Sequence, residues 1–386
     1  MRSNFRPLYQ RIQERIRAEY LVGSADENAT RLPTERELQA HYGVSRPTIS
    51  KALTALAAEG HIARAQGRGS FAVQKPYSSE DAAQRLIGCI APLGDAPLVQ
   101  RAFRGMDRVG HRKGYRVLLS SAGFSVDRER LAVEDFLAAG VRGLVIYPVA
   151  RLQSELLDDY LIHDALPVPV VLIDTPIPEQ RHTQVIFDNR RAGYAMTTWL
   201  LSRGYRRIAL LTCDPALRHT PLIARQLGYR DALQDHGVRF DPRLVRGVEI
   251  RSEPPDLGEP LQEWFHSEAP PDAIIAPEDM LALDVVDMLA SSGIRVPEDV
   301  RVVGFDNRDA ARRHRPPLAT TNPDFERMGE IACELLTDAI DGAPISDRTY
   351  VLDVPILTRR SLDGAAPPIV LGDRARSALV GSGGAN

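Results

Sequence analysis

Cationic and short polar side chains gather in one stretch near the amino terminus, and they have the chemistry to read DNA. Their spacing would place them on one face of a helix. In a major groove an arginine can pair bidentately with guanine, and a threonine can touch the methyl group of thymine. The pattern predicts a surface for base edges, although a short helical pair with a solvated polar face is an alternative that the spacing leaves open. The residues of this face are Arg46, Thr48, Ser50, Lys51 and Thr54.

Two short helices joined by a tight turn must hold this face, and the sequence predicts them within residues 32–56. Thr34 and Glu37 have the spacing of a capping box at the start of the first helix, and Gly43 can end that helix. Ser45 is placed to cap the second helix. Apolar residues recur at helical spacing on the inward face of the second helix: Ile49, Ala52, Leu53 and Leu56.

Two short strands are predicted after the second helix. They cover residues 62–64 and 70–73, and a glycine-containing turn over residues 67–69 joins them. A hairpin of this kind can lay its backbone and Arg68 beside phosphates or in the minor groove. Helix, turn, helix and hairpin together predict a winged helix-turn-helix domain, which we place at residues 1–74.

A resemblance to the GntR family covers residues 32–73, which read LPTERELQAHYGVSRPTISKALTALAAEGHIARAQGRGSFAV. The winged helix-turn-helix of that family has the same elements in the same order. The resemblance implies DNA contacts for Arg36, Arg46, Thr48 and the tip of the wing. Ser50 stands where the family usually has arginine, so we expect an altered operator preference. The expected DNA-binding residues are Arg36, Ser45, Arg46, Thr48, Ser50, Lys51, Gly67, Arg68 and Gly69.

Charge is divided unevenly along the chain. Residues 1–75 hold twelve Lys and Arg against seven Asp and Glu, hence +5, and the remainder carries −8 of the total of −3. A cationic head on an acidic body is typical of a DNA-binding module joined to a domain with another task. With 386 residues and 44% hydrophobic content, the chain is long enough for two or three domains with proper cores.

The three cysteines are far apart in the sequence and form no CxxC pair: Cys89, Cys213 and Cys333. They predict neither a disulfide framework nor a structural metal, and they favour a reducing compartment. The first twenty residues have no signal-peptide core, and the longest apolar run, residues 165–173, contains two prolines. We therefore expect a cytoplasmic protein without a metal or cofactor.

Predicted strands and helices alternate through the rest of the chain. After a linker at residues 75–85, the alternation runs over residues 86–173, and it restarts over residues 185–305. This spacing predicts an α/β fold with doubly wound parallel sheets in two tandem halves. Ligands of such sheets bind at the carboxyl ends of the strands, so we expect a cleft between two lobes. The expected ligand-sensing domain spans residues 86–362, followed by a flexible tail at 363–386.

A second resemblance covers residues 85–362, which are similar to the ligand-sensing core shared by LacI-type repressors and periplasmic sugar-binding proteins. Its carriers include GLVIYP at Gly143, VIFDNRRAGY at Val185, IRVPEDVRVVGFDN at Ile294 and PPLATTNPDFERMGEIACELL at Pro316. A GntR-like head on such a periplasmic-binding-protein-like body resembles the arabinose-repressor subgroup. The resemblance implies a cytoplasmic transcription regulator controlled by a small effector, for which we expect a sugar.

Carboxylates follow two of the predicted strands and are the main candidates for holding the effector. Asp174 and Asp306 would face the cleft, where they could accept hydrogen bonds from sugar hydroxyls. The resemblance implies the same, since Asp306 occupies the usual position of the ligand aspartate. Glu278 stands where the family usually has asparagine, and the added negative charge makes a phosphorylated or carboxylated effector less favourable.

The other candidates supply donors and an apolar face. Arg218 follows a predicted strand, and Arg225 either donates to the effector or braces the loop. Phe124 could stack on a sugar ring. The candidate effector-binding residues are Phe124, Asp174, Arg218, Arg225, Glu278 and Asp306.

The principal hypothesis is a homodimeric transcriptional repressor that reads a pseudo-palindromic operator and responds to a small effector. The effector can act only if it binds the two states of the protein with different affinity. Two alternatives stay open: a cytoplasmic sugar-binding protein and an α/β enzyme, in each of which the basic head is not a specific DNA reader. The absence of GxSxG, Walker and GxGxxG motifs from the sequence disfavours an enzyme.

Overall fold

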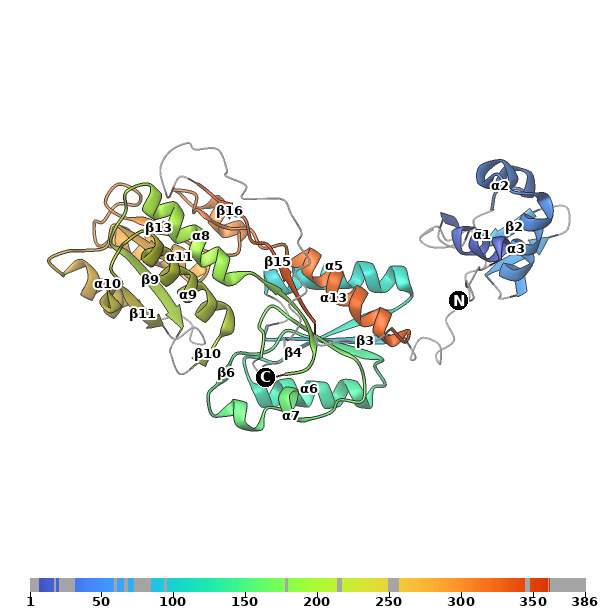
Figure 1. The fold of residues 1–386 in the computed structure, drawn as a ribbon, viewed down its shortest axis with the longest axis horizontal. Coiled ribbons are helices and arrows are strands. Elements are labelled where there is room, and N and C mark those ends of the chain that lie inside the picture. Colours follow the sequence, from blue (N-terminus) through green and yellow to red (C-terminus); the bar gives the residue numbers. More distant parts are fainter. Residues whose placement is uncertain are drawn as a thin grey trace, which may run out of the picture. The chain divides into compact units, whose positions relative to one another are not determined.

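The computed structural model describes most of the chain, which forms two compact units (Figure 1). We call Met1–Gln84 the head and Arg85–Asn386 the sensor. Among the residues expected to act, Gly67 and Arg68 lie outside the described residues, as do most of the expected linker and the tail. The described residues are 7–16, 19–20, 32–58, 61–65, 69–72, 85–93, 96–177, 180–213, 217–248, 257–343, 348–359 and 361.

Within its described residues, the head contains three helices and a two-stranded hairpin. Strands β1 (Ile62–Ala65) and β2 (Gly69–Ala72) pair antiparallel, with Ile62 opposite Ala72. The helices are α1 (Leu8–Ile16), α2 (Glu35–Tyr42) and α3 (Arg46–Ala58). The predicted inward face of α3 is confirmed, because its apolar residues are buried in one core with residues of α1, α2 and β1. The buried members are Ile12, Ile16, Leu32, Leu38, Ile49, Ala52, Leu53, Leu56 and Ile62.

Local sequence signals set the ends of α2. The backbone N–H of Glu37 donates to Thr34 Oγ1 at 3.3 Å, and the N–H of Thr34 donates to Glu37 Oε2 at 2.7 Å, which confirms the capping box. Gly43 has a φ of 65° in the left-handed region and ends the helix, as its type predicts. The turn that aims α3 is therefore specified by residues close together in the sequence.

The first lobe of the sensor is a six-stranded parallel sheet with helices on both faces (Figure 1). Helices α5 (Pro97–Lys113) and α13 (Phe325–Ile340) cover one face, and α6 (Val126–Ala138) and α7 (Tyr160–His163) cover the other. Because both faces are covered, the inner strands are almost entirely apolar. In spatial order the strands are β15 (Thr349–Leu352), β8 (Thr183–Phe187), β7 (Val170–Ile173), β5 (Gly143–Ile146), β3 (Leu86–Ala91) and β4 (Arg116–Ser121).

The second lobe repeats this architecture with a smaller sheet of four parallel strands. Helices α8 (Asn189–Ser202) and α9 (Thr220–Asp235) pack on one face, and α10 (Gly258–Phe265) and α11 (Asp279–Ser291) pack on the other. In spatial order the strands are β11 (Val245–Val248), β9 (Ile208–Cys213), β12 (Ala273–Ile275) and β13 (Arg301–Val303). The predicted α/β class with parallel sheets is confirmed.

The expectation of two tandem halves is wrong, because the lobes are interleaved. Strand β8, predicted to open the second half, belongs to the first sheet, where Val185 pairs with Ile173 and Tyr350. Val185 and Phe187 are buried in the same apolar cluster as residues of α5 and α13. After the second lobe the chain returns through α13 and β15 to the first. Alternation in the sequence indicates the type of each element but not the sheet that a strand joins.

Several short elements at the edges of the lobes have no clear sequence signal. Asp159 is extended, with φ −67° and ψ 121°, and separates η2 (Glu155–Asp158) from α7. The remaining short elements are β6 (Arg151–Leu152), β10 (Leu217–Arg218), η3 (Pro242–Leu244), α12 (Asp309–Arg313), β14 (Thr320–Thr321) and β16 (Ile356–Leu357).

Cys89, Cys213 and Cys333 are buried free thiols. Across the part of the chain that the structure describes, no helix combines the length and apolar character needed to cross a membrane. Nor do the described His, Cys, Asp and Glu side chains come together in groups of three or more that could hold a metal ion.

Glycines allow the paired helices α5 and α13 to touch at their backbones. A Cβ atom at Gly329 would lie 2.0 Å from the carbonyl oxygen of Ala102, and a Cβ at Gly105 would lie 2.0 Å from that of Glu326. Both distances are far below van der Waals contact. The close packing of these helices on the sheet therefore depends on the missing side chains.

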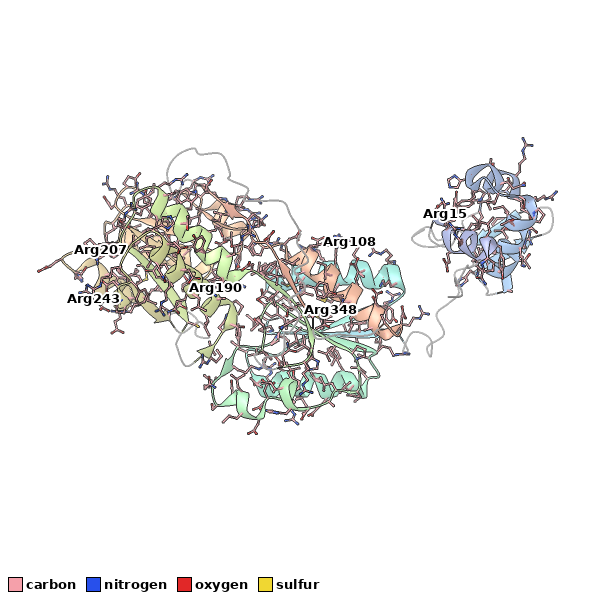
Figure 2. All side chains as sticks on the ribbon, viewed as in Figure 1. Arg15, Arg108, Arg190, Arg207, Arg243 and Arg348 are labelled. Atoms are coloured by element: carbon pink, nitrogen blue, oxygen red, sulfur yellow. The ribbon has the colours of Figure 1, made fainter. Side chains whose placement is uncertain are left out.

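A glycine also allows two helices of the second lobe, α8 and α9, to touch at their backbones. A Cβ at Gly193 of α8 would lie 2.2 Å from the backbone oxygen of Arg225 on α9, one of the candidate effector residues. Arg190 lies at the surface of this lobe (Figure 2). Its Nε lies 2.7 Å from Asp231 Oδ2 and so joins α8 to α9. The backbone of Arg225 is thus held directly against the neighbouring helix.

We predict that Gly329→Ala destabilises the sensor. Alanine favours a helix over glycine by about 1 kcal/mol, but the overlap with Ala102 must force α5 and α13 apart. The free energy of unfolding should fall by about 1–3 kcal/mol, measured by chemical denaturation of the full chain. Gly105→Ala should act alike, and the double variant should lose less than the sum, because one displacement relieves both overlaps. A neutral Gly329→Ala would contradict this packing.

Candidate DNA-binding face and effector site

The predicted DNA-reading residues of α3 lie at the surface of the head. Arg46 and Lys51 are exposed, and Thr48 and Ser50 are half-buried. Ser45 directly precedes the helix, and its hydroxyl lies 2.9 Å from that of Thr48. The polar face at the start of α3 is therefore present as the spacing predicts.

The other expected DNA contacts come from α2 and the wing. Arg36 is exposed on α2, and Gly69 begins β2 with a φ of 108°, a conformation suited to glycine. Gly67 and Arg68 lie outside the described residues, so their contacts stay predictions.

A chain of polar contacts ties α2, α3 and β1 together at this surface. Glu35 Oε2 accepts from Arg46 Nε at 3.2 Å, and Glu35 Oε1 accepts from Arg64 Nη2 at 2.5 Å. Arg64 Nη1 also donates to Thr54 Oγ1 at 3.1 Å. Sequence reasoning missed Glu35 and Arg64, since its only signals were an acidic residue in a first helical turn and a lone cation in a predicted strand. Both belong to the same surface as Arg46.

Lys51 has a partner on the first helix. Its Nζ lies 4.3 Å from the centre of the Tyr9 ring, within the range of a cation–π contact. The two side chains line an open hollow of about 580 Å³ on the exposed side of α3. The hollow is lined by Tyr9, Pro47, Ser50, Lys51, Thr54, Ala55 and Ala58. Lys51 is thus positioned by α1 as well as by its own helix.

The two candidate carboxylates follow strands of different lobes. Asp174 directly follows β7, and Asp306 lies shortly after β13. Both are nearly buried and adopt the left-handed region, with φ of 61° and 93°. For a residue with a side chain this conformation costs about 1–3 kcal/mol, and such strain clusters at ligand sites. Phe124 and Asn307 share it, with φ of 58° and 51°.

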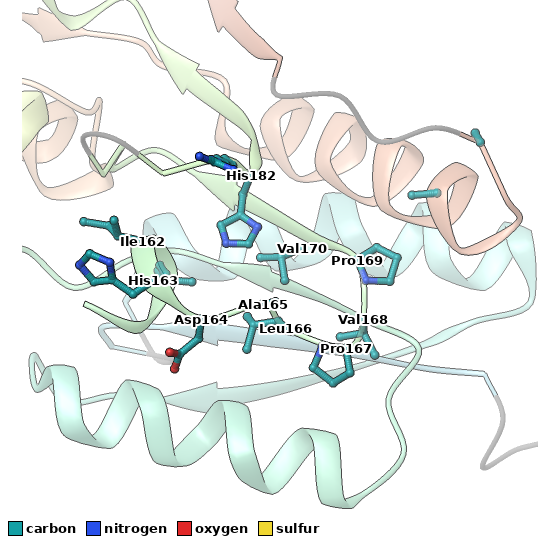
Figure 3. A pocket seen from close by; sticks show the side chains of 14 residues that line it. Ile162, His163, Asp164, Ala165, Leu166, Pro167, Val168, Pro169, Val170 and His182 are labelled. Carbon is teal, nitrogen blue, oxygen red and sulfur yellow. The ribbon is translucent and has the colours of Figure 1, made fainter. Parts of the chain in front are cut away.

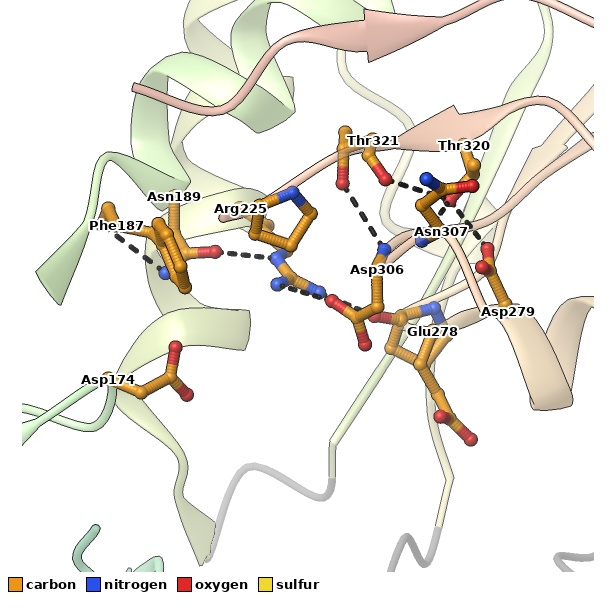
Figure 4. A network of polar contacts seen from close by, with 12 residues as sticks. Asp174, Phe187, Asn189, Arg225, Glu278, Asp279, Asp306, Asn307, Thr320 and Thr321 are labelled. Carbon is orange, nitrogen blue, oxygen red and sulfur yellow. Dashed lines mark hydrogen bonds and ion pairs between the residues drawn. The ribbon is translucent and has the colours of Figure 1, made fainter. Parts of the chain in front are cut away.

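Arg225 connects Asp306 to the helices beside it (Figure 4). Its Nη2 lies 3.6 Å from Asp306 Oδ1, its Nε donates to Asn189 Oδ1 at 2.8 Å, and its Nη1 donates to the Pro277 carbonyl at 2.6 Å. The guanidinium also lies over the Phe305 ring, 4.2 Å from its centre. Arg225 therefore braces the site, and Asn189 belongs to the same network.

Asp188, the neighbour of Asn189, does cap a helix. Its Oδ1 accepts from the backbone N–H of Arg191 at 2.9 Å, so Asp188 is the N-cap residue of α8. The two side chains of the Asp188–Asn189 pair therefore have separate tasks.

Asp174 has a tyrosine partner that the sequence did not single out. The hydroxyl of Tyr147, the residue directly after β5, donates to Asp174 Oδ2. Burial raises the pKa of Asp174 to about 6, against the lowering effects of Tyr147 and Arg225, and the charge of Asp306 adds to the rise. Burial and the neighbouring Asp174 also hold the pKa of Tyr147 well above its usual value. Residues of both lobes thus influence the pKa of Asp174.

Two acidic residues at the start of α11 complete the cluster. Glu278 Oε2 pairs with Arg308 Nη2 at 2.9 Å. Asp279 accepts from Thr320 Oγ1 at 2.6 Å and from the backbone N–H of Arg308 at 2.7 Å, so it braces the segment after β13 instead of capping α11. Burial raises the pKa of Asp279 to about 7.

Arg218 and Phe124 have different surroundings. Arg218 lies in β10, which pairs antiparallel with β6 of the first lobe, and its Nε donates to Gln153 Oε1 at 2.6 Å. Phe124 is 37% exposed after β4. Among the contacts of the described residues, none joins either side chain to Asp174 or Asp306. Their direct roles toward an effector stay predictions.

A buried ionic cluster holds β6 in place, and sequence reasoning missed it. Arg151 is 2% exposed and donates to Glu129 Oε1 at 2.5 Å and to Asp159 Oδ2 at 2.7 Å. Tyr160 donates to the same Glu129 oxygen at 2.9 Å. A charged group so deeply buried requires these partners. The cluster fixes the first-lobe half of the β6–β10 pair that joins the lobes.

An open hollow of about 860 Å³ lies elsewhere on the first lobe, near the start of β7 and the end of α13 (Figure 3). Asp174, in contrast, follows the opposite, carboxyl end of β7. The hollow is lined by residues 161–170, Arg181, His182, Ala339 and Ala343. It therefore contains none of the predicted effector residues.

Comparison with known proteins identifies both parts of the chain. Residues 8–72 match the bacterial regulatory proteins of the gntR family, and residues 197–362 match a periplasmic binding protein-like domain. The HTH-type transcriptional regulator CelR of Thermobifida fusca is 31% identical over 255 residues, which cover 64% of this chain and 71% of CelR. The chain belongs to the HTH-type transcriptional regulators.

Further relatives extend over more of the chain. The arabinose metabolism transcriptional repressor of Geobacillus stearothermophilus is 27% identical over 344 residues, covering 88% of this chain and 93% of that protein. The solved structure of a transcriptional regulator CelR–cellobiose complex has the same fold, with a TM-score of 0.61 and 24% identity, and covers 86% of this chain and all of that one.

These relatives confirm two expectations. The chain combines a GntR-type DNA-binding domain with a periplasmic binding protein-like domain, and it acts as a transcriptional regulator. The protein is a DNA-binding transcriptional regulator with a small-molecule sensor, and its relatives are regulators, not enzymes. The alternatives of a plain sugar-binding protein or an α/β enzyme with an incidental basic head are therefore set aside.

The raised pKa of Asp174 predicts a pH dependence of stability. Between about pH 4 and pH 6 the folded state keeps a proton that the unfolded chain has lost, so the free energy of unfolding falls as the pH rises through this window. Asp174→Asn should make the melting temperature less dependent on pH between about 4 and 6. Asp231→Asn is the control, because its pKa is lowered by the Arg190 hydrogen bond. An unchanged pH profile in Asp174→Asn would contradict the assignment.

Proposed function

We propose that this regulator is a repressor that releases its operator when a neutral sugar binds between the two lobes of the sensor. The polar cluster at the carboxyl ends of strands from both lobes carries the proposal. Asp174 comes from the first lobe, and Asp306 and Arg225 come from the second. Together they offer acceptors and donors in pairs, which suits the vicinal hydroxyls of a sugar.

The charges of the cluster favour a neutral effector. Arg225 faces Asp306, and Arg308 pairs with Glu278. Among the described residues, no cation forms an ion pair with Asp174, whose hydrogen bond comes from the neutral Tyr147. A phosphate or carboxylate on the effector would therefore meet a carboxylate that has no cation in direct contact.

Two relatives support a sugar as the effector. A CelR regulator of the same fold is known in complex with cellobiose, and another relative is a repressor of arabinose metabolism. Cellobiose and arabinose are both neutral and rich in hydroxyl groups. The proposed effector of the present chain is therefore a neutral sugar, without a more specific identity.

The repressor is proposed to act as a homodimer in the cytoplasm, where two heads would read two operator half-sites. Exposed apolar side chains on the sensor are available for such a contact: Leu131 of α6 and Met280 and Met288 of α11. Within each chain we propose a DNA-binding domain at residues 1–74, a linker at 75–85, the sensor domain at 86–362 and a tail at 363–386.

Replacing Arg46 tests the DNA-binding half of the proposal. Arg46→Ala should weaken operator binding by about 1–3 kcal/mol and relax base preference at one position, because a bidentate contact is lost. Fluorescence anisotropy with a set of single-base operator variants measures both effects. Arg15→Ala, which removes the same charge from α1, should leave base preference unchanged. Wild-type affinity and selectivity in Arg46→Ala would rule out this role.

Replacing Asp306 tests the sensing half. Asp306→Ala should bind operator as the wild type does but should no longer release it when the sugar is added, since the effector loses its main acceptor. The measurement is operator binding across a titration of the sugar. Asp309→Ala, an exposed neighbour on α12, serves as the control and should respond normally. Release of Asp306→Ala at the wild-type sugar concentration would contradict the proposal.

A further inference from the structure

A carboxylate lies among the cations of the DNA-binding face. Glu35 accepts from Arg46 through one oxygen and from Arg64 through the other, at 3.2 and 2.5 Å. Its side chain is 24% exposed, whereas those of Arg46 and Arg64 are 76% and 39% exposed. Two cations from different elements are therefore held by one less accessible acid.

The geometry leaves the reading end of Arg46 available. Glu35 engages Arg46 through Nε. A bidentate contact with guanine uses the terminal nitrogens of the guanidinium group. Arg46 can therefore keep its bond to Glu35 and still present Nη1 and Nη2 to a base edge. The carboxylate restricts the side chain without blocking its contact.

Arg64 is held by two partners at once. Besides Glu35, it donates to Thr54 Oγ1, and the Thr54 hydroxyl itself donates to the Ser50 carbonyl at 2.7 Å. The network thus fixes β1 against the middle of α3, beside the position where the related family usually has an arginine and this chain has Ser50.

A carboxylate at this place opposes non-specific binding. Attraction between cations and phosphates supplies nearly all the affinity for unrelated duplex DNA. Glu35 offsets part of the charge of Arg46 and Arg64 and keeps both side chains from turning toward any nearby phosphate. The negative charge of Glu35 therefore weakens binding to all DNA sequences. The orientation that Glu35 gives to Arg46 favours sequences that place a guanine opposite Arg46.

We propose that Glu35 is a specificity-determining positioning residue for operator recognition, acting through Arg46 and Arg64. The inference rests on the proposed DNA-reading role of Arg46. It adds that the selectivity of the head depends on an acidic residue that never touches a base.

The test compares two duplexes bound by the full-length protein. One is a duplex selected by the wild-type chain from a random-sequence pool, and the other is a random duplex of the same length. Anisotropy titrations at several salt concentrations give the affinity for each and their ratio, and thermal unfolding checks that each variant is folded. The variants are Glu35→Gln and Arg64→Gln. Glu19→Gln is the charge-matched control, since Glu19 binds His41 and Tyr42 instead of the two arginines.

Opposite charge effects with the same loss of selectivity are the expected result. Glu35→Gln should bind the random duplex more tightly and Arg64→Gln less tightly, yet the selected-to-random ratio should fall about tenfold in both. Glu19→Gln should tighten binding to both duplexes and leave the ratio unchanged.

The inference is overturned if Glu35→Gln keeps the wild-type ratio of affinities for the selected and random duplexes. It is also overturned if Glu35→Gln and Arg64→Gln change this ratio in opposite directions, as their opposite charge changes alone would do. If Glu35→Gln does not fold, Arg64→Gln alone decides, because it breaks the same network from the other side. A wild-type chain without any preference for its selected duplex would instead refute the proposed function itself.

Discussion

The contact between Arg225 and Asp306 determines how the sensor is built around its site. Asp306 is 7% exposed and strained at its backbone, so without a cation its charge would be costly to bury. Arg225 supplies that cation, and its other nitrogens hold Asn189 at the start of α8 and the Pro277 carbonyl before α11. A ligand that binds Asp306 must share it with Arg225. Since Gly193 leaves the backbone of Arg225 in contact with α8, such a ligand acts directly on the packing of the second lobe.

At this site, charged groups of the two lobes interact with one another. Asp174 belongs to the first lobe, yet Arg225 and Asp306 of the second lobe both act on its pKa. An effector that changes the spacing of these groups changes the energy of each lobe arrangement, which is the requirement for a ligand-driven switch. The head contains a similar arrangement, because Glu35 forms ion pairs with two arginines there. In both units a buried or half-buried acid fixes where an arginine can act.

Sequence reasoning succeeded where the signal is local and failed where partners are distant. The capping box and the apolar face of α3 depend on neighbouring residues, and both are present. The strand-end position of Asp174 and Asp306 followed from the alternation of strands and helices. Tyr147 lies 27 residues before Asp174, and Arg64 lies 29 residues after Glu35, so only the folded chain reveals these pairs. The place of β8 in the first sheet was missed for the same reason, because strand pairing is not encoded in periodicity.

Thermal unfolding of the full chain with a panel of pentoses, hexoses, disaccharides and uronates tests the central claim most directly. A neutral sugar at one hundred times its dissociation constant should stabilise the wild-type sensor by about 2.7 kcal/mol. We expect one class of neutral sugar to raise the melting temperature and Asp306→Ala to lose this shift. Stabilisation of Asp306→Ala to the same extent, or a response to uronates alone, would contradict it.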